Sequence, residues 1–150
     1  MKIYVDADAC PVINEIIQMT KEKSLDVILV RSYAHYTPSK SGDHVKEIYV
    51  DQEKDMVDFK ILQLVRKNDI VITQDYGLAA LSLSKDCHVL HHNGFKYTNN
   101  NINHLLTLRH KNAMARKANQ KLNGPKTYTE ENRIKFLQLL KEIIATYKNE

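Results

Sequence analysis

Apolar positions along the first 90 residues follow two alternating patterns. Short apolar runs predict strands over residues 2–6, 26–31, 47–51, 69–73 and 87–90. Between these runs, apolar residues recur at helical spacing and predict helices from Pro11 to about 21–23, from Asp55 to 66–68, and after Asp75. The run over 26–31 is continuous, which is typical of a strand covered on both faces. Alternating strands and helices predict an α/β sandwich with a mostly parallel sheet.

The pattern changes after residue 90, because no further strand is expected there. Apolar spacing predicts helix from Asn101 to about Lys121, a break over 123–125 and a last helix from Thr129, whose hydroxyl suits a helix cap. The polar stretch over 32–44 has no apolar periodicity and is typical of a mobile loop. We therefore expect an α/β core over 1–92 and a helical, basic extension packed on it over 93–150.

Composition narrows the class of protein. With 150 residues, 43% of them hydrophobic and 27% charged, the chain is most simply one folded domain. No apolar run approaches the roughly 20 residues of a membrane span, and acids stand near the start, so a cytoplasmic protein is expected. Cys10 and Cys87 have no metal-binding spacing and are expected to be small buried thiols; a reactive thiolate is the alternative for Cys10.

Charge is distributed unevenly around a net value of +4. Residues 1–75 hold 10 lysines and arginines against 13 acids, whereas residues 76–150 hold 12 against 5, and no acid stands between Cys87 and Thr129. A basic, acid-free stretch is often a solvated surface, but it also suits RNA or single-stranded nucleic acid, with tyrosines such as Tyr128 as stacking surfaces. The residues predicted to bind nucleic acid are Lys96, Tyr97, Arg109, Lys111, Arg116, Lys117, Lys121 and Lys126.

Aspartates follow three of the predicted strands. Asp6 and Asp8 end the first strand, Asp55 and Asp58 open the helix after the third, and Asp75 follows the fourth. Residues i and i+2 of an extended chain point the same way, so Asp6 and Asp8 are expected to emerge together. Because the carboxyl ends of parallel strands share one edge, we expect all five carboxylates to converge there.

Simpler roles stay open for some of these acids. Asp55 and Asp75 suit helix N-caps, and Asp58 suits a first helical turn. Asp43 and Asp51 are rivals that rank lower, because strand alternation turns Asp51 away from the expected site.

The chemistry of the acids favours a hard metal ion. Neighbouring carboxylates such as Asp6 and Asp8 cost stability unless a cation pairs with them. Oxygen ligands indicate Mg²⁺ or Mn²⁺ rather than zinc. His91 and His92 are adjacent on a strand, so they point oppositely and are expected to be ordinary surface or loop histidines.

Several aspartates around one or two divalent ions suit hydrolysis of a phosphodiester. The ion activates water and neutralises charge that develops on the phosphate. Hydroxyls of Thr73 and Thr37 are expected to contact the phosphate. The aspartates expected to be catalytic are Asp6, Asp8 and Asp75.

Several segments together resemble one family: residues 5–12 (Val-Asp-Ala-Asp-Ala-Cys-Pro-Val), 55–58, 69–75 with 78–80, 94–98 with 101–102, and 124–125 before the last helix. Over essentially the whole chain they resemble the YaiI/YqxD family of bacterial proteins. The resemblance implies a single PIN-like domain over 1–150, a three-layer α/β/α sandwich whose characterised relatives are Mg²⁺- or Mn²⁺-dependent nucleases, often acting on RNA. It implies a metal site built from Asp6, Asp8, Asp55, Asp58 and Asp75.

Three functional hypotheses follow. The first is a metal-dependent nuclease acting on RNA or single-stranded nucleic acid. The second is a PIN-like protein that binds nucleic acid without cleaving it. The third is a phosphatase with an aspartyl nucleophile, because Asp6 and Asp8 are spaced like a nucleophile and an acid after a strand, although no Gly-Thr follows Asp8.

Overall fold

A computed structural model describes residues 1–35, 42–121 and 126–148. Its centre is a six-stranded sheet in the order β3-β2-β1-β4-β5-β6. The first five strands along the chain run parallel, and β6 pairs with β5 in the antiparallel sense. The strands are β1 (Ile3–Asp6), β2 (Val27–Ser32), β3 (Val45–Val50), β4 (Ile70–Ile72), β5 (His88–His91) and β6 (Phe95–Tyr97).

Helices connect the strands and complete the chain. Two short 3₁₀ helices follow β1 and β2, and five α-helices are present in the described residues. In that part of the chain, none of the helices combines the length and the apolar character that crossing a membrane requires. The helices are η1 (Ala7–Ala9), α1 (Ile13–Thr20), η2 (Tyr33–His35), α2 (Met56–Leu64), α3 (Tyr76–Ser84), α4 (Ile102–Lys117) and α5 (Glu130–Lys148).

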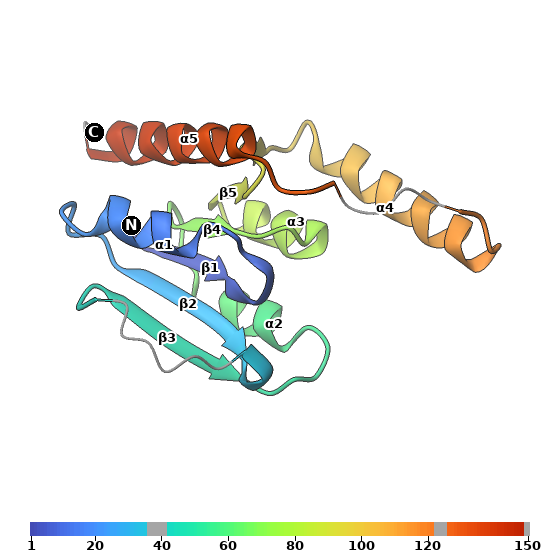
Figure 1. The fold of residues 1–150 in the computed structure, drawn as a ribbon, viewed down its shortest axis with the longest axis horizontal. Coiled ribbons are helices and arrows are strands. Elements are labelled where there is room, and N and C mark those ends of the chain that lie inside the picture. The colour runs from blue at the N-terminus through green and yellow to red at the C-terminus, as the bar shows by residue number, and fades with distance from the viewer. Residues whose placement is uncertain (36–41, 122–125, 149–150) are drawn as a thin grey trace.

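The sheet is covered on both faces, which makes three layers (Figure 1). Helices α1 and α5 cover one face, where Ile16 and Phe136 are buried with Val5 of β1. Helices α2 and α3 and the start of α4 cover the other, where Ile61 is buried with Tyr4 of β1. Successive residues of β1 thus serve opposite layers, as the pleat of a strand requires. The predicted α/β sandwich with a mostly parallel sheet is confirmed.

The expectation that the fifth strand is the last is wrong. Strand β6 is only three residues long and carries Lys96 at its centre, so it offers too little apolar pattern to be recognised. Gly94 makes the turn before it with φ +98°, and a Cβ there would lie 2.5 Å from Lys135 Cβ on α5. Residues 93–150 therefore contribute a strand to the sheet and, through α5, most of one helical layer.

Element ends differ from the sequence predictions by one to four residues. Helix α1 begins at Ile13 instead of Pro11, and α2 ends at Leu64 instead of 66–68. Residues 36–41 of the loop predicted over 32–44 lie outside the described residues, and so do Thr37 and the break predicted over 123–125.

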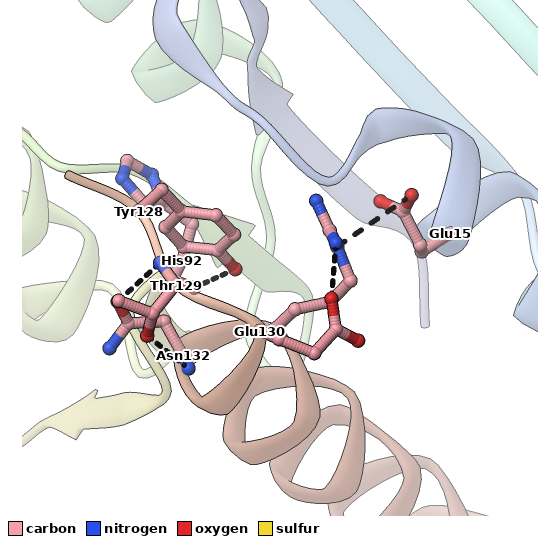
Figure 2. A network of polar contacts seen from close by, with 7 residues as sticks. Glu15, His92, Tyr128, Thr129, Glu130 and Asn132 are labelled. Atoms are coloured by element: carbon pink, nitrogen blue, oxygen red, sulfur yellow. Dashed lines mark hydrogen bonds and ion pairs between the residues drawn. The ribbon is translucent and has the colours of Figure 1, made fainter.

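The start of α5 is fixed by polar contacts (Figure 2). The Thr129 hydroxyl accepts from the Asn132 amide at 3.1 Å, and the Asn132 side chain accepts from the Thr129 amide at 3.0 Å. This reciprocal cap confirms the predicted helix start. One residue earlier, the Tyr128 hydroxyl donates to the His92 carbonyl at 2.7 Å. Tyr128 therefore anchors α5, and its ring meets His92 edge-on.

An arginine then joins α5 to α1. Arg133 contacts Glu130 at 2.6 Å within α5 and reaches Glu15 of α1 at 3.9 Å (Figure 2). Its guanidinium also lies 5.7 Å from the centre of the Tyr128 ring. These contacts connect the two helices of this layer.

Candidate functional site

The carboxyl ends of β1 and β4 and the segments after β2 and β3 border one cavity of about 470 Å³. Asp6 is the last residue of β1, Asp8 lies in η1, and Asp75 stands directly before α3. Asp55 and Asp58 lie at the start of α2, which follows β3. The structure thus brings all five predicted aspartates together at one cavity, as the topology of a parallel sheet predicts.

The prediction that strand alternation places Asp8 beside Asp6 is wrong. The chain leaves the extended conformation after Asp6 and enters η1, so strand alternation does not govern Asp8. Asp8 Oδ1 instead accepts from the Ser32 amide at 3.0 Å, at the end of β2. This contact ties η1 to the end of the neighbouring strand and places both carboxylates at the cavity.

Thr73 contacts the carboxylate of Asp6 and the backbone of Asp75. Its hydroxyl donates to Asp6 Oδ2 at 2.9 Å and accepts from the Asp75 amide at 2.9 Å. Because its one hydroxyl hydrogen goes to Asp6 and the side chain is buried, Thr73 has none left for a phosphate, and the role predicted for it is wrong. Its carbonyl accepts from the Tyr97 hydroxyl at 3.2 Å, so this strand end is held from both sides.

The helix-capping alternatives have different outcomes. Asp75 does cap α3, because its Oδ1 accepts from the Leu78 amide at 3.0 Å. Asp55 occupies the cap position of α2 but makes no side-chain cap bond, and its φ of +64° is unusual for a residue with a side chain. Asp58 stands in the first turn, as predicted. Helix capping therefore accounts for Asp75 but not for Asp55.

Burial and mutual repulsion disfavour ionisation in the cavity. The pKa of Asp58 rises to about 7, first because of burial and then because of the charges of Asp75, Asp6 and Asp55. A hydrogen bond with the Asp75 carboxylate raises it further. Burial also raises the pKa of Asp6, with Asp75 and Asp8 adding to the effect and the Thr73 hydroxyl opposing it. The cavity therefore concentrates negative charge that its own residues do not fully neutralise.

The donor set suits Mg²⁺ or Mn²⁺, because it consists of carboxylate oxygens, with no cysteine or histidine among the described residues that line the cavity. Among the neighbouring carboxylates, Asp75 contributes most to the raised pKa of both Asp6 and Asp58. As the described side chains are placed, no three acidic, histidine or cysteine groups converge closely enough to hold one ion. Binding an ion therefore requires side-chain rotation within the cavity.

Cys10 is not an activated nucleophile. Burial raises its pKa to about 12, so the thiol stays protonated at neutral pH. Cys87 is buried, and its thiol donates to the Arg66 carbonyl at 3.4 Å.

Comparison with known proteins identifies the family. A family model described as "Uncharacterized BCR, YaiI/YqxD family" matches residues 4–146. The chain belongs to the YaiI/YqxD family. UPF0178 proteins of Bacillus mycoides (strain KBAB4) and Oceanobacillus iheyensis are each 51% identical over 97% of this chain and 99% of their own length. A UPF0178 protein of Bacillus anthracis (strain A0248) is 50% identical over the same shares.

These names state no reaction, so YaiI/YqxD membership establishes the family and leaves the activity open. No solved structure matches the chain. The likeness to PIN-like domains stays a prediction.

A second hollow, which we call the α4 groove, adjoins the cavity and shares Asp55, Asp58 and Asp75 with it. It encloses about 590 Å³ and is lined by residues of α2, α3 and α4. Arg109 of α4 lines it, with Nη1 3.9 Å from Asp75 Oδ1. Of the residues predicted to bind nucleic acid, Arg109 is the one that the described structure places at the cavity or the groove.

The other predicted binding residues lie elsewhere in this YaiI/YqxD fold. Lys96 stands on β6 and borders a separate pocket against α5. Tyr97 is fully buried, so the prediction that its ring stacks on a base is wrong; its apolar neighbours in β6 and α4 make it a core residue. The remaining residues are exposed on the outer part of α4 and the segment beyond it: Lys111, Arg116, Lys117, Lys121 and Lys126.

The prediction that Asp51 points away from the site is wrong. Strand β3 ends at Val50, so alternation does not extend to Asp51, which lines the cavity together with Glu53. The low rank of Asp43 fits the structure, because Asp43 precedes β3 at the opposite edge of the sheet. Nothing in the sequence marked Phe59 or Lys54 as groove residues, because helix α2 must first be placed beside α3 and α4.

Proposed function

We propose that this protein is a divalent-metal-dependent nuclease that hydrolyses phosphodiester bonds in RNA or other single-stranded nucleic acid. One observation carries the proposal: five aspartates from three separate strand ends line one open cavity, where burial and then their mutual repulsion raise the pKa of Asp6 and Asp58. Groups with such perturbed pKa values gather at functional sites, where a ligand completes the charge balance.

Within this proposal, Asp6, Asp58 and Asp75 hold Mg²⁺ or Mn²⁺, with Asp8 and Asp55 beside them. When bound, the ion supplies an activated water and neutralises charge on the phosphate. Thr73 links Asp6 to the start of α3, and Arg109 offers a positive charge beside Asp75. The resemblance to PIN-like nucleases supports the same reaction.

The aspartyl phosphatase is disfavoured by the environment of Asp6. One of its oxygens already accepts from Thr73, and burial raises its pKa. The hydrogen bond makes that oxygen a weaker nucleophile.

The proposal is tested by incubating purified protein with end-labelled single-stranded RNA in Mn²⁺, in Mg²⁺ and in EDTA. Cleavage is expected with the metals and not in EDTA. Asp8→Asn is expected to lower the rate by about 100-fold or more, in the range for loss of one electrostatic group at a reacting centre. Asp26→Asn is the matched control, because Asp26 is an exposed acid at the opposite edge of the sheet. Equal rates for Asp8→Asn and the wild type contradict the proposed site.

A non-catalytic nucleic-acid binder is the second candidate. It is favoured by the finding that no three potential ligand groups of the described residues converge on one point. Tight, salt-sensitive RNA binding without turnover in either metal would support this candidate over the nuclease.

A further inference from the structure

The α4 groove combines features that the carboxylate cavity lacks. Its walls carry apolar side chains from three helices, and its rim carries Arg109, His110 and Lys54. The groove opens directly onto Asp55, Asp58 and Asp75, so a ligand that spans both hollows meets apolar, positive and negative surfaces in turn.

Phe59 supplies the exposed ring of the groove. It lies one helical turn beyond Asp55, since its amide donates to the Asp55 carbonyl at 2.9 Å, and its side chain is 63% exposed. Leu81 of α3 lines the same groove and is 54% exposed. A flat, apolar ring that stays accessible beside a charged site suits the face of a nucleobase.

Arg109 supplies a positive charge whose one ion pair within the described residues is weak. Its contact with Asp75 is long, at 3.9 Å, and more than half of the Arg109 side chain is exposed, so this pair contributes little stability. The guanidinium can therefore exchange a carboxylate for a phosphate, which it binds through two parallel hydrogen bonds.

Gly77 makes room for this arginine. A Cβ at Gly77 would lie 3.4 Å from Arg109 Nη1 and 3.1 Å from Asp75 Oδ1. The missing side chain lets the guanidinium approach the start of α3 beside the carboxylate. Arg109 can thereby lie beside Asp75, which lines both the cavity and the groove.

We propose that the α4 groove is a subsite for one nucleotide of a single strand, with its base on Phe59 and its phosphate on Arg109. The proposal rests on the proposed function and specifies where the strand lies next to the reacting phosphate. Bases in a duplex are stacked on both faces, so only an unpaired or splayed base presents a face to Phe59.

The base contact is tested by binding. A fluorescein-labelled RNA of ten adenylates is titrated with protein in Mn²⁺, in the Asp8→Asn background to prevent cleavage, and fluorescence anisotropy gives Kd. Phe59→Ala is expected to weaken binding about 5- to 30-fold, the lower part of the range for base stacking, and Phe59→Tyr is expected to restore it. Ile134→Ala, an equally exposed apolar residue on α5, is expected to bind like the parent.

The phosphate contact is tested in the same assay at several salt concentrations. Arg109→Ala is expected to weaken binding and to lower the slope of log Kd against log salt by about 1, whereas Arg66→Ala, an exposed arginine before β4 at the opposite edge of the sheet, leaves both unchanged. A duplex of the same length is expected to compete poorly.

The outcomes separate this proposal from the proposed function. If wild-type protein cleaves RNA while Phe59→Ala binds and cleaves equally well, the groove is not a base subsite and the nuclease proposal stands. A duplex that competes as well as the single strand also overturns the subsite. If the wild type neither binds nor cleaves RNA in Mn²⁺ or Mg²⁺, both proposals fail.

Discussion

Asp58 in the carboxylate cavity and the histidine pair at the end of β5 are both disfavoured in their charged forms, and burial is the main cause in each region. Burial raises the pKa of Asp58 to about 7 and lowers the pKa of His91 to about 4. The two regions differ in access: Asp58 lines an open cavity, whereas His91 and His92, which were expected to be surface or loop histidines, are buried and only 8% and 9% exposed. A shifted pKa therefore marks a candidate site only where a ligand can reach it.

The two regions also differ in the contacts that their titratable side chains make with the rest of the fold. His91 Nδ1 accepts from the Asn93 amide at 2.9 Å, and its ring stacks on Phe95 at 4.7 Å. The His92 carbonyl receives the Tyr128 hydroxyl that anchors α5 (Figure 2). The contacts of His91 hold its neutral ring within the fold, whereas a proton or a bound cation would relieve the repulsion at Asp58. Substitutions in the two regions should therefore have opposite effects on activity and stability.

The largest expected effect is on activity at Asp58. Asp58→Asn removes a negative charge from the proposed metal site, so RNA cleavage in Mn²⁺ should fall about 100-fold or more. The same change should not destabilise the metal-free protein, because ionised Asp58 is repelled by its neighbours. The measurements are the cleavage rate and thermal unfolding in EDTA at pH 8. A variant that unfolds at a clearly lower temperature would show that Asp58 is structural.

The pH dependence of stability has opposite signs in the two regions. The raised pKa of Asp58 means that its contribution to the free energy of unfolding is complete below about pH 4 and is lost as the pH rises toward 7. The lowered pKa of His91 means that its contribution to the free energy of unfolding is complete above about pH 6.5 and is lost as the pH falls toward 4.

A stability prediction at His91 follows. In metal-free Asp58→Asn protein, the histidine effect is measured without the opposing aspartate, and the free energy of unfolding should fall by about 1 to 3 kcal/mol between pH 6.5 and 4. Adding His91→Gln should flatten this decline and lower stability at pH 7.5, while His104→Gln, at an exposed position on α4, changes neither. Urea unfolding at a series of pH values provides the measurement. An unchanged slope in the His91 variant would contradict the assigned cause.

The position of the aspartates was predictable because it follows from topology. Asp6, Asp55 and Asp75 each follow a strand in the sequence, and strands that run parallel end at one edge whatever their order in the sheet. The strand order itself was not readable, and it was not needed for this inference. The short strand β6 was missed because three residues contain too little pattern.

The details of the site were not predictable, because they depend on contacts between elements far apart in sequence. The position of Thr73 after a strand predicts a phosphate ligand, but its hydroxyl bridges Asp6 and the Asp75 amide. Tyr97 was predicted to stack on a base, but it lies on β6 and is buried in the core. Phe59 had no signal, since an exposed position on a helix becomes part of a groove only when other helices pack beside it.

A smaller effect is expected at Thr73, which links the cavity to the core. Thr73→Val keeps the shape but removes the hydroxyl, so the Asp75 amide loses its acceptor and Asp6 loses a donor. Stability should fall by about 1 to 2 kcal/mol, and cleavage should fall with it as Asp6 loses its orientation. Thr73→Ser retains the hydroxyl and should preserve more of both properties. The measurements are urea unfolding and RNA cleavage; equal behaviour of the two variants would contradict the positioning role.

The smallest expected effect tests whether the cavity and the α4 groove act together. Gly77→Ala adds a Cβ 3.1 Å from Asp75 Oδ1 and 3.4 Å from Arg109 Nη1, so one of these groups must shift by a few tenths of an ångström. Because the pair is partly exposed, RNA binding should weaken only about two- to five-fold, and thermal stability should stay near that of the wild type.

In Arg109→Ala protein the added methyl has no guanidinium to displace, so Gly77→Ala should have a smaller effect on binding there than in the wild type. Equal effects in both backgrounds would show that the added methyl group acts through Asp75 and not through Arg109. Non-additive effects would support an arginine that spans the two hollows, which is the coupling expected if one strand occupies both.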